Sequence, residues 1–253
     1  MKRIMSHIEI QEAHKKGHII PYFQTLHRTR DGACSGVEIL TRINDPINGI
    51  IDPASFLPFL ERHEMALPIT EKIMGNVLDV LHDLDYLLPV NFNVSFNVGA
   101  NLLNNQGLVK LCCSLAERLN PSVNICVELT ERQEFYHNKE EQRNIKKLKD
   151  ASVKVILDDF GIAHSDLRLL SRYESDGIKI PRELISNDRT NKRAEIIEKY
   201  IIAIARDLGM EVTAEGITTL EQYNRMKSCK VDYMQGYFFS KPISGAEFKQ
   251  LWM

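Results

Sequence analysis

Acidic side chains stand inside several short apolar runs of this sequence. Glu38 lies in GVEIL, Glu128 in CVELTE, and the pair Asp158-Asp159 in VILDDFG. A buried carboxylate is costly unless it is ion-paired, hydrogen-bonded or bound to a metal ion. For a single acid at the end of a strand, an ion pair is the simplest explanation. The residues with this placement are Glu38, Asn97, Glu128, Glu131, Asp158, Asp159, Lys179, Glu215 and Gln235.

As a set, these strand-end residues require cations. Acids gathered on one rim repel one another, and the set contains one evident cation, Lys179. Carboxylate and amide oxygens are ligands for Mg²⁺, Mn²⁺ or Ca²⁺. Two adjacent aspartates with further acids nearby also suit two metal ions about 3.5–4 Å apart, bridged by an attacking water. We therefore expect a site for in-line displacement at phosphorus.

Two other metal chemistries match the sequence less well. The eight histidines are scattered and form no HExxH motif, which argues against a zinc protease. His82-Asp83 is the HD dipeptide found in another class of metal phosphohydrolase. It lies in a helical pattern, VLDVLHDLDYL, without further His-rich helices around it. We interpret this dipeptide as a pair on the surface of a helix.

Short β-rich runs alternate with longer helical patterns from residue 19 to the end of the chain. The clearest run is 90–98, where apolar and polar residues alternate with a period of two. Residues 69–84 and 197–208 follow helical spacing, and the second of these helices is expected to end at Gly209. The predicted strands are 19–23, 36–40, 90–98, 124–129, 154–158, 177–180, 211–214 and 233–235.

This outline predicts an α/β fold, a single-domain TIM-like (β/α)8 barrel in which one strand could run antiparallel. Barrel enzymes place their chemistry at the C-terminal ends of the strands, where the acids lie. A doubly wound open sheet is the alternative, but it usually carries a Gly-rich loop after its first strand, and this chain has no GxGxxG. We expect an N-terminal helical extension at 1–18 and the barrel at 19–253.

Composition excludes several classes of partner. With a net charge of -2, the chain lacks the excess of basic residues that is typical of a duplex-DNA binder. The five cysteines are odd in number and contain no CxxC, which is typical of reduced thiols in the cytoplasm. No segment approaches the roughly 18 apolar residues that cross a bilayer, and the N-terminus lacks the features of a signal peptide. We expect a cytoplasmic protein that binds neither duplex nucleic acid nor a membrane.

Taken together, the motifs resemble those of the bacterial EAL-domain cyclic-di-GMP phosphodiesterases, from about residue 19 to residue 250. The signature Glu-Ala-Leu corresponds to Glu38-Ile39-Leu40, followed by Arg42. Any one motif is weak, but all of them occur in the family order, which makes the resemblance specific. The others are DPASFLPFLE at 52–61, Asn97, ELTE at 128–131, DDFG at 158–161, the KxD lysine Lys179, AEG at 214–216 and QGYFFSKP at 235–242.

The resemblance implies a role for each site residue. Lys179 would hold the nucleophilic water or stabilise negative charge, Gln24 and Arg42 would contact the substrate, and Gln235 and Glu131 would complete the shell. Catalysis would depend on Lys179, Glu215, Asp159 and Glu131. One metal would be held by Glu38, Asn97, Glu128 and Asp158, and a second by Asp158, Asp159 and Glu215.

The implied reaction is the opening of cyclic-di-GMP to linear pGpG. It would use two divalent cations, Mg²⁺ or Mn²⁺, with Ca²⁺ expected to inhibit. The family expectation is a homodimer. Because few residues precede the first predicted strand, we expect regulation through expression, dimerisation or a separate regulatory protein.

The sequence departs from the family pattern at a few places outside the implied metal ligands. Pro181 replaces the Asp of KxD, and Thr218 replaces the Glu after AEGV. The other departures are Thr25 after Gln24, Gly99 after Asn97, and the loop 162–167 after DDFG. Loss of a residue that supports a ligand typically costs about 10–100-fold in affinity or activity, so we expect reduced but real turnover.

A non-hydrolysing regulator is the alternative to an active phosphodiesterase. Such a protein would keep the barrel and bind cyclic-di-GMP or a protein partner. The departures at Pro181 and Thr218 favour it. The retained acids favour the enzyme, because a protein that only binds partners has no physical need for so many unpaired carboxylates.

Overall fold

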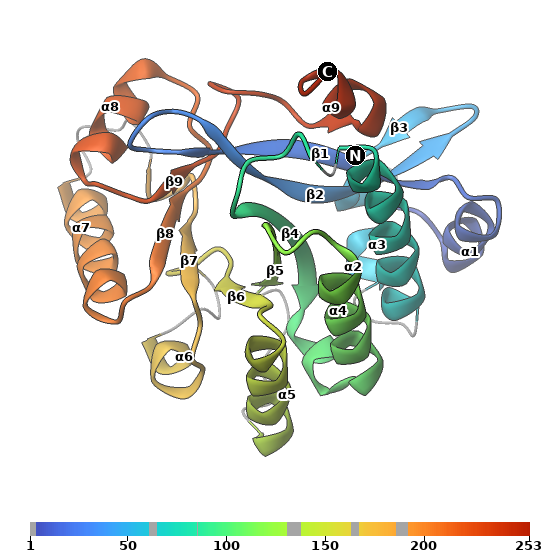
Figure 1. Ribbon diagram of the computed structural model, residues 1–253, viewed down its shortest axis with the longest axis horizontal. Helices are drawn as coiled ribbons and strands as arrows, with labels where there is room; N and C mark the ends of the chain where they lie inside the picture. Colours follow the sequence, from blue (N-terminus) through green and yellow to red (C-terminus); the bar gives the residue numbers. More distant parts are fainter. Residues whose placement is uncertain (1–3, 61–64, 85, 131–137, 163–166, 186–191) are drawn as a thin grey trace.

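A computed structural model describes residues 4–60, 65–84, 86–130, 138–162, 167–185 and 192–253. Its centre is a closed ring of eight strands in the order β1-β2-β4-β5-β6-β7-β8-β9, with β9 paired back to β1 (Figure 1). The strands are β1 (Ile19–Arg28), β2 (Cys34–Asp45), β4 (Phe92–Gly99), β5 (Val123–Thr130), β6 (Lys154–Leu157), β7 (Gly177–Ile180), β8 (Glu211–Ala214) and β9 (Tyr233–Met234). The expected TIM-like barrel is confirmed, and the open sheet is wrong because β1 closes the ring.

Strand β1 is the antiparallel member of the ring. It pairs antiparallel with β2 and with β9, whereas each pair from β2 round to β9 is parallel. Only residues 29–33 join β1 to β2. A parallel crossover needs a dozen or more residues, so this short connection forces the chain to return antiparallel.

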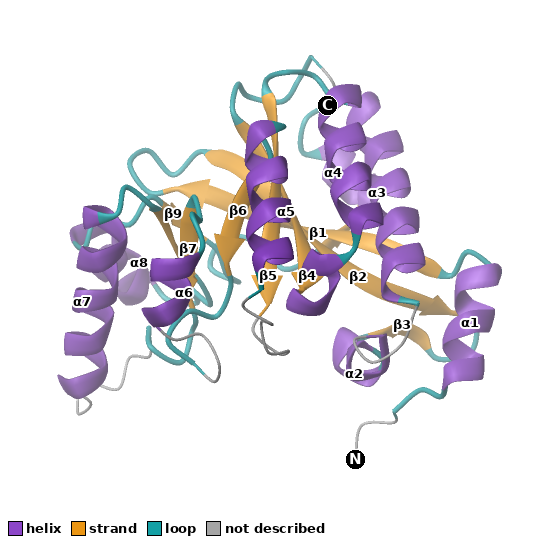
Figure 2. Ribbon diagram, turned by 90° about the horizontal axis from the view of Figure 1, so that it is seen from below, coloured by secondary structure: helices purple, strands orange, loops and turns teal. Residues whose placement is uncertain are grey.

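Helices and short strands surround the ring (Figure 2). Two short strands extend the sheet outside it: β3 (Gly49–Ile51) pairs with β2, and β10 (Ile243–Ser244) pairs with β1. Among the described residues, no helix combines the length and apolarity required to span a bilayer. The helices are α1 (His7–Lys15), η1 (Pro53–Ser55), α2 (Leu57–Leu60), α3 (Ala66–His82), η2 (Ala100–Asn104), α4 (Gln106–Arg118), α5 (Lys139–Asp150), α6 (Leu167–Arg172), α7 (Lys192–Asp207), α8 (Leu220–Ser228) and α9 (Gly245–Gln250).

The alternation predicted for 90–98 forms β4, which is buried on both sides. Phe92 and Val94 are buried among apolar side chains. Asn93 and Ser95 are buried as well, and the Asn93 Oδ1 accepts a hydrogen bond from the Asn124 Nδ2 at 3.1 Å, whereas Asn97 near the end of the strand is exposed. The strand begins at Phe92 and not at 90, because Asn91 has a φ of +62°, which no extended strand accommodates.

Candidate active site

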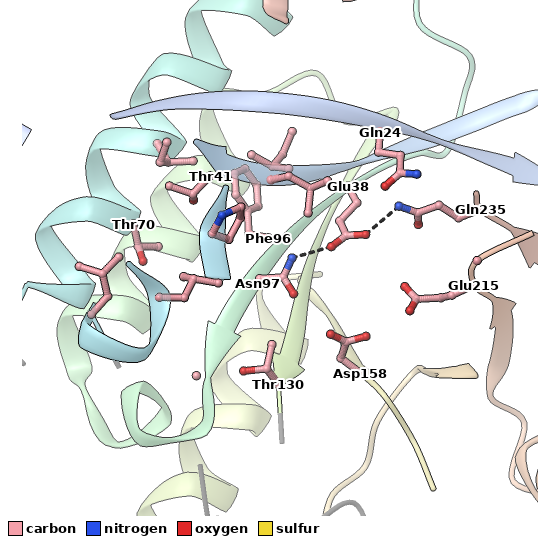
Figure 3. A pocket seen from close by; sticks show the side chains of 18 of the residues that line it. Gln24, Glu38, Thr41, Thr70, Phe96, Asn97, Thr130, Asp158, Glu215 and Gln235 are labelled. Atoms are coloured by element: carbon pink, nitrogen blue, oxygen red, sulfur yellow. Dashed lines mark hydrogen bonds between the residues drawn. The ribbon is translucent and has the colours of Figure 1, made fainter. Parts of the chain in front are cut away.

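The polar residues at the strand ends converge at one end of the barrel. Glu38, Glu128 and Lys179 lie on β2, β5 and β7, and Asp158 and Glu215 directly follow β6 and β8. The carboxyl ends of parallel strands meet at one edge of a sheet, so these side chains share a small volume. Figure 3 shows Glu38, Asp158 and Glu215 pointing toward one another, with Asn97 and Gln235 beside Glu38.

Lys179 forms the centre of this cluster and is 1% exposed. Its Nζ lies 3.1 Å from the Glu38 Oε2 and 2.8 Å from the Glu128 Oε2. The same nitrogen lies 3.6 Å from the Asp158 Oδ1 and 2.6 Å from the Glu215 Oε1. One ammonium therefore faces four carboxyl groups, and their ionised forms would leave an excess of negative charge.

Burial and the neighbouring charges shift the pKa values of these groups. Burial raises the pKa of Glu128 to about 8. Burial also raises the pKa of Glu215 well above its usual range, although Lys179 opposes the shift. Burial disfavours the Lys179 ammonium, but the four carboxylates outweigh it and raise its pKa. Without another cation the cluster retains protons, and a divalent cation would compensate the same charge.

Glu38 is the acid that is best prepared to remain ionised. Burial by itself would raise its pKa, but Lys179 and two amide donors outweigh burial and lower it. The Asn97 Nδ2 donates to the Glu38 Oε1 at 2.6 Å, and the Gln235 Nε2 donates to the Oε2 at 2.7 Å. Gln24 lies opposite Glu38 across the β1–β2 pair, and its Nε2 donates to the Ser240 carbonyl at 3.4 Å.

A second group of carboxylates shares Asp158 and Glu215 with the first. Asp158, Asp159 and Glu215 each offer an oxygen, and these atoms all lie within 4.8 Å of one another. Asp159 has a φ of +48°, and its backbone N–H donates to the Asp158 Oδ1 at 3.0 Å. A non-glycine residue in the left-handed region is uncommon and concentrates at functional sites. This donor set, made of hard oxygens with adjacent aspartates, fits the expected pair of divalent cations.

The acids face a cleft of about 770 Å³, a volume typical of small-molecule sites. One wall is apolar and comes from η1, α2 and α3. The other wall is polar and includes Glu38, Asn97, Asp158, Glu215 and Gln235. The lining residues of the apolar wall include Pro53, Leu57, Leu60, Ala66, Ile69 and Ile73. The cleft therefore offers apolar surface next to a site for charge.

Most of the residues singled out from the sequence lie together, with two exceptions. Arg42 does not line the cleft, and it lies over the Tyr22 ring at 5.7 Å, with its side chain 11% exposed. Glu131 lies outside the described residues. The residues brought together are Gln24, Glu38, Asn97, Glu128, Asp158, Asp159, Lys179, Glu215 and Gln235. Among the lining residues that sequence reasoning did not single out, Arg182 is the basic one.

The positions that depart from the family pattern have local partners. Pro181 is buried directly after β7. The Thr218 hydroxyl donates to the Gln222 Oε1 at 3.0 Å, at the start of α8. Thr25 shares a 2.6 Å hydrogen bond with the Ser240 hydroxyl. These substitutions are accommodated by the structure, while residues 163–166 of the divergent loop lie outside its described part.

Gly236, next to the site residue Gln235, tolerates no side chain. It has a φ of +153°, and a Cβ added there would lie 2.2 Å from the carbonyl oxygen and 2.3 Å from the nitrogen of Ile217. Backbone atoms cannot rotate away, so we expect Gly236→Ala to lower the free energy of unfolding by about 3 kcal/mol. Denaturant unfolding monitored by circular dichroism measures the change.

Gly75→Ala provides the matched control for this substitution. Gly75 lies inside α3, and no atom lies within 4 Å of its added Cβ. We expect this variant to be more stable than the wild type, by about 0.5–1 kcal/mol. Equal midpoints for Gly236→Ala and the wild type would contradict the steric argument.

Comparisons with known proteins agree with this geometry. The profile of the EAL domain matches residues 8–242. The chain is 31% identical to the cyclic di-GMP phosphodiesterase PdeL of Escherichia coli over 92% of its own length and 65% of PdeL. It is 28% identical to the probable cyclic di-GMP phosphodiesterase PdeG of the same organism, over 93% of its own length and 46% of PdeG. The chain thus spans between about half and two thirds of these relatives.

The fold is also similar to that of a solved EAL enzyme. The EAL enzyme Bd1971, solved in a form with cAMP and cyclic-di-GMP bound, superposes with a TM-score of 0.88 at 24% identity. That superposition covers 97% of this chain and 68% of Bd1971. The profile match extends over most of the sequence, and it includes each strand of the ring and the acids at their ends. The chain belongs to the EAL domain family.

Proposed function

We propose that this protein is a metal-dependent phosphodiesterase that hydrolyses cyclic-di-GMP to linear pGpG. The observation that carries the proposal is the excess of carboxylates at the floor of the cleft. Four of them surround the Lys179 ammonium, and Asp158, Asp159 and Glu215 offer oxygens within 4.8 Å of one another. Relatives named cyclic di-GMP phosphodiesterases support the choice of substrate.

Two Mg²⁺ or Mn²⁺ ions suit this oxygen-rich donor set, and Ca²⁺ is expected to inhibit. Glu38, Asn97, Glu128 and Asp158 would hold one ion. Asp158, Asp159 and Glu215 would hold the other. When bound, the ions would lower the pKa of an attacking water and neutralise charge that develops at phosphorus.

The chain's own residues orient and stabilise the reaction. Asn97 and Gln235 fix the rotamer of Glu38 by donating to its two oxygens. Lys179 is held by carboxylates on several sides, so its ammonium is positioned to retain the nucleophilic water or to stabilise negative charge in the transition state. The apolar wall from η1, α2 and α3 excludes water on one side of the cleft and provides surface for a nucleobase.

The test is direct. Purified protein is incubated with cyclic-di-GMP and Mg²⁺ or Mn²⁺, and the nucleotides are separated by chromatography. We expect linear product with the wild type and none with EDTA or with Glu38→Ala. The substitution removes the carboxylate that accepts hydrogen bonds from Asn97, Lys179 and Gln235. Glu12→Ala is the control, since Glu12 is exposed and pairs with Lys16 at the end of α1.

A folded wild type that makes no product with metal present would overturn the proposal. The family member would then be a non-hydrolysing regulator, which the substitutions at Pro181 and Thr218 favour. Product that persists unchanged in EDTA would contradict the metal-dependent mechanism.

A further inference from the structure

The cleft presents charges of mostly one sign to a substrate that is itself an anion. Glu38, Asp158 and Glu215 line it. Among the described residues that line it, Arg182 is the one basic side chain. Lys179 is buried beneath the cleft by its carboxylate partners. Arg42, which the sequence led us to expect at the substrate, lies at the margin of the cleft: it is not a lining residue, but it interacts electrostatically with the lining residues Tyr237 and Glu38.

Arg42 is also committed to its own surroundings. Its Nη1 donates to the Thr41 carbonyl at 3.0 Å, and its Nε lies 3.8 Å from the Asp52 Oδ1. Its guanidinium stacks over Tyr22. A ligand in the cleft therefore displaces only an exposed partner, Glu183, to reach Arg182, whereas it meets Arg42 only after several contacts change.

The backbone beneath Arg182 is firmly held. It follows Pro181, which is buried directly after β7. The proline ring fixes the φ of Pro181 itself. Arg182 also packs against Gly216, where an added Cβ would lie 2.3 Å from the Cβ of Arg182. Gly216 has a φ of +64° and directly follows Glu215. The close approach places the Arg182 main chain next to the second group of carboxylates.

The far end of the same side chain is available to a ligand. The Arg182 side chain is 79% exposed, and its Nε lies 3.6 Å from an oxygen of Glu183, which is itself 61% exposed. An exposed pair at this distance contributes little, so a substrate phosphate can replace Glu183 at small cost. An arginine whose backbone is held in place and whose guanidinium is exposed to solvent can bind a phosphate through two parallel hydrogen bonds.

Cyclic-di-GMP contains two phosphodiesters, and each carries a negative charge. The carboxylates and their cations would take the phosphate that is cleaved. The other phosphate keeps its negative charge throughout the reaction, and a cation outside that cluster would stabilise it. We propose that Arg182 binds this second phosphate and is a further substrate-binding residue of the proposed phosphodiesterase site. The inference rests on the proposed function.

The experiment compares Arg182→Ala, Arg182→Lys and Arg30→Ala with the wild type. Arg30 is the matched control, because its side chain is 74% exposed and it pairs with the neighbouring Asp31 away from the cleft lining. Alanine keeps the Cβ that packs on Gly216, so the substitution leaves this backbone contact in place. Steady-state kinetics with cyclic-di-GMP and the affinity for Mn²⁺ are measured for each protein.

We expect Arg182→Ala to raise KM about 10–100-fold, the loss typical of a charged hydrogen bond, with kcat within about threefold of the wild type. Arg182→Lys should recover part of the loss, and Arg30→Ala should match the wild type. Mn²⁺ affinity should be unchanged in all three, since Arg182 is not a ligand. A weakened Mn²⁺ affinity, or a fall in kcat with KM unchanged, would overturn the assignment in favour of a structural or scissile-phosphate role.

The wild type separates this inference from the proposed function. If the wild type hydrolyses cyclic-di-GMP and Arg182→Ala has the same KM, only the inference fails. If the wild type binds the nucleotide without hydrolysing it, the dissociation constants replace KM: a ratio above about ten supports Arg182, and a ratio near one overturns it. If the wild type neither binds nor hydrolyses the nucleotide, both fail.

Discussion

Lys179→Met should abolish hydrolysis and, in EDTA, lower the free energy of unfolding by about 3–5 kcal/mol. The methionine keeps the length of the chain and removes the charge that four buried carboxyl groups share. Removing one partner of a buried ionic cluster leaves its other charges uncompensated, which costs far more than an exposed pair. Chemical denaturation and a cyclic-di-GMP turnover assay measure the two effects.

A divalent cation should reverse part of that destabilisation. Saturating Mn²⁺ supplies the positive charge that the methionine lacks, so it should raise the melting temperature of Lys179→Met more than that of the wild type. Activity should stay lost, because the ammonium at the cleft floor is not restored. Equal Mn²⁺-induced shifts in the two proteins would show that lysine and metal compensate different charges.

Lys154→Met is the matched control. Lys154 on β6 also bonds a glutamate, with 2.8 Å between its Nζ and the Glu211 Oε2, but this pair is about one third exposed. Its loss should cost at most about 1 kcal/mol and leave hydrolysis intact. A large effect at Lys154 would mean that the barrel tolerates no lysine replacement, independent of the active site.

The site residues that could be predicted from the sequence are those whose type conflicts with their neighbours. Glu38 and Glu128 stand between apolar residues, and in the structure they are 8% and 4% exposed. A carboxylate there has no explanation in packing, so the conflict itself indicates a site. Arg182 has no such conflict, since PREL after a strand is an ordinary polar segment, and only the fold brings it against Gly216.

The existence of the ring strands and the presence of one antiparallel strand were predictable, whereas the identity of that strand and the ends of the strands were not. All eight predicted runs contain strands of the ring, because hydrophobic runs and period-two alternation depend on burial. Strand β1 runs on to Arg28, beyond the predicted 23, because its hairpin with β2 supplies hydrogen-bond partners that alternation does not encode. Strands β3 and β10 went unpredicted for the same reason.

Arg42 illustrates what a motif leaves undetermined, namely the partners of a long side chain. The motif gives the position of an arginine two residues after the signature, but a long side chain can point to several partners. In this chain Tyr22 and Asp52 lie within its reach and hold it beside the cleft rather than in its lining.

Asp159→Asn should reduce the number of bound Mn²⁺ ions from two per chain to one and lower kcat at least about 1000-fold. In the proposed arrangement Asp159 contributes to one ion only, together with Asp158 and Glu215. Asparagine keeps the shape and is among the residues that best tolerate a φ of +48°. The substitution therefore removes charge without adding backbone strain, and the thermal stability in EDTA should hold or rise as repulsion is relieved.

Isothermal titration with Mn²⁺ counts the ions, and Asp83→Asn is the control. Asp83 and His82 form the HD dipeptide at the end of α3. Asp83 pairs with Lys249 and does not line the cleft. The Asp83→Asn variant should keep two ions and full turnover. Loss of an ion in Asp83→Asn would revive the HD dipeptide as a ligand. Two ions in Asp159→Asn would refute the two-ion assignment, because one of the two acids assigned solely to the second ion would then be dispensable for binding it.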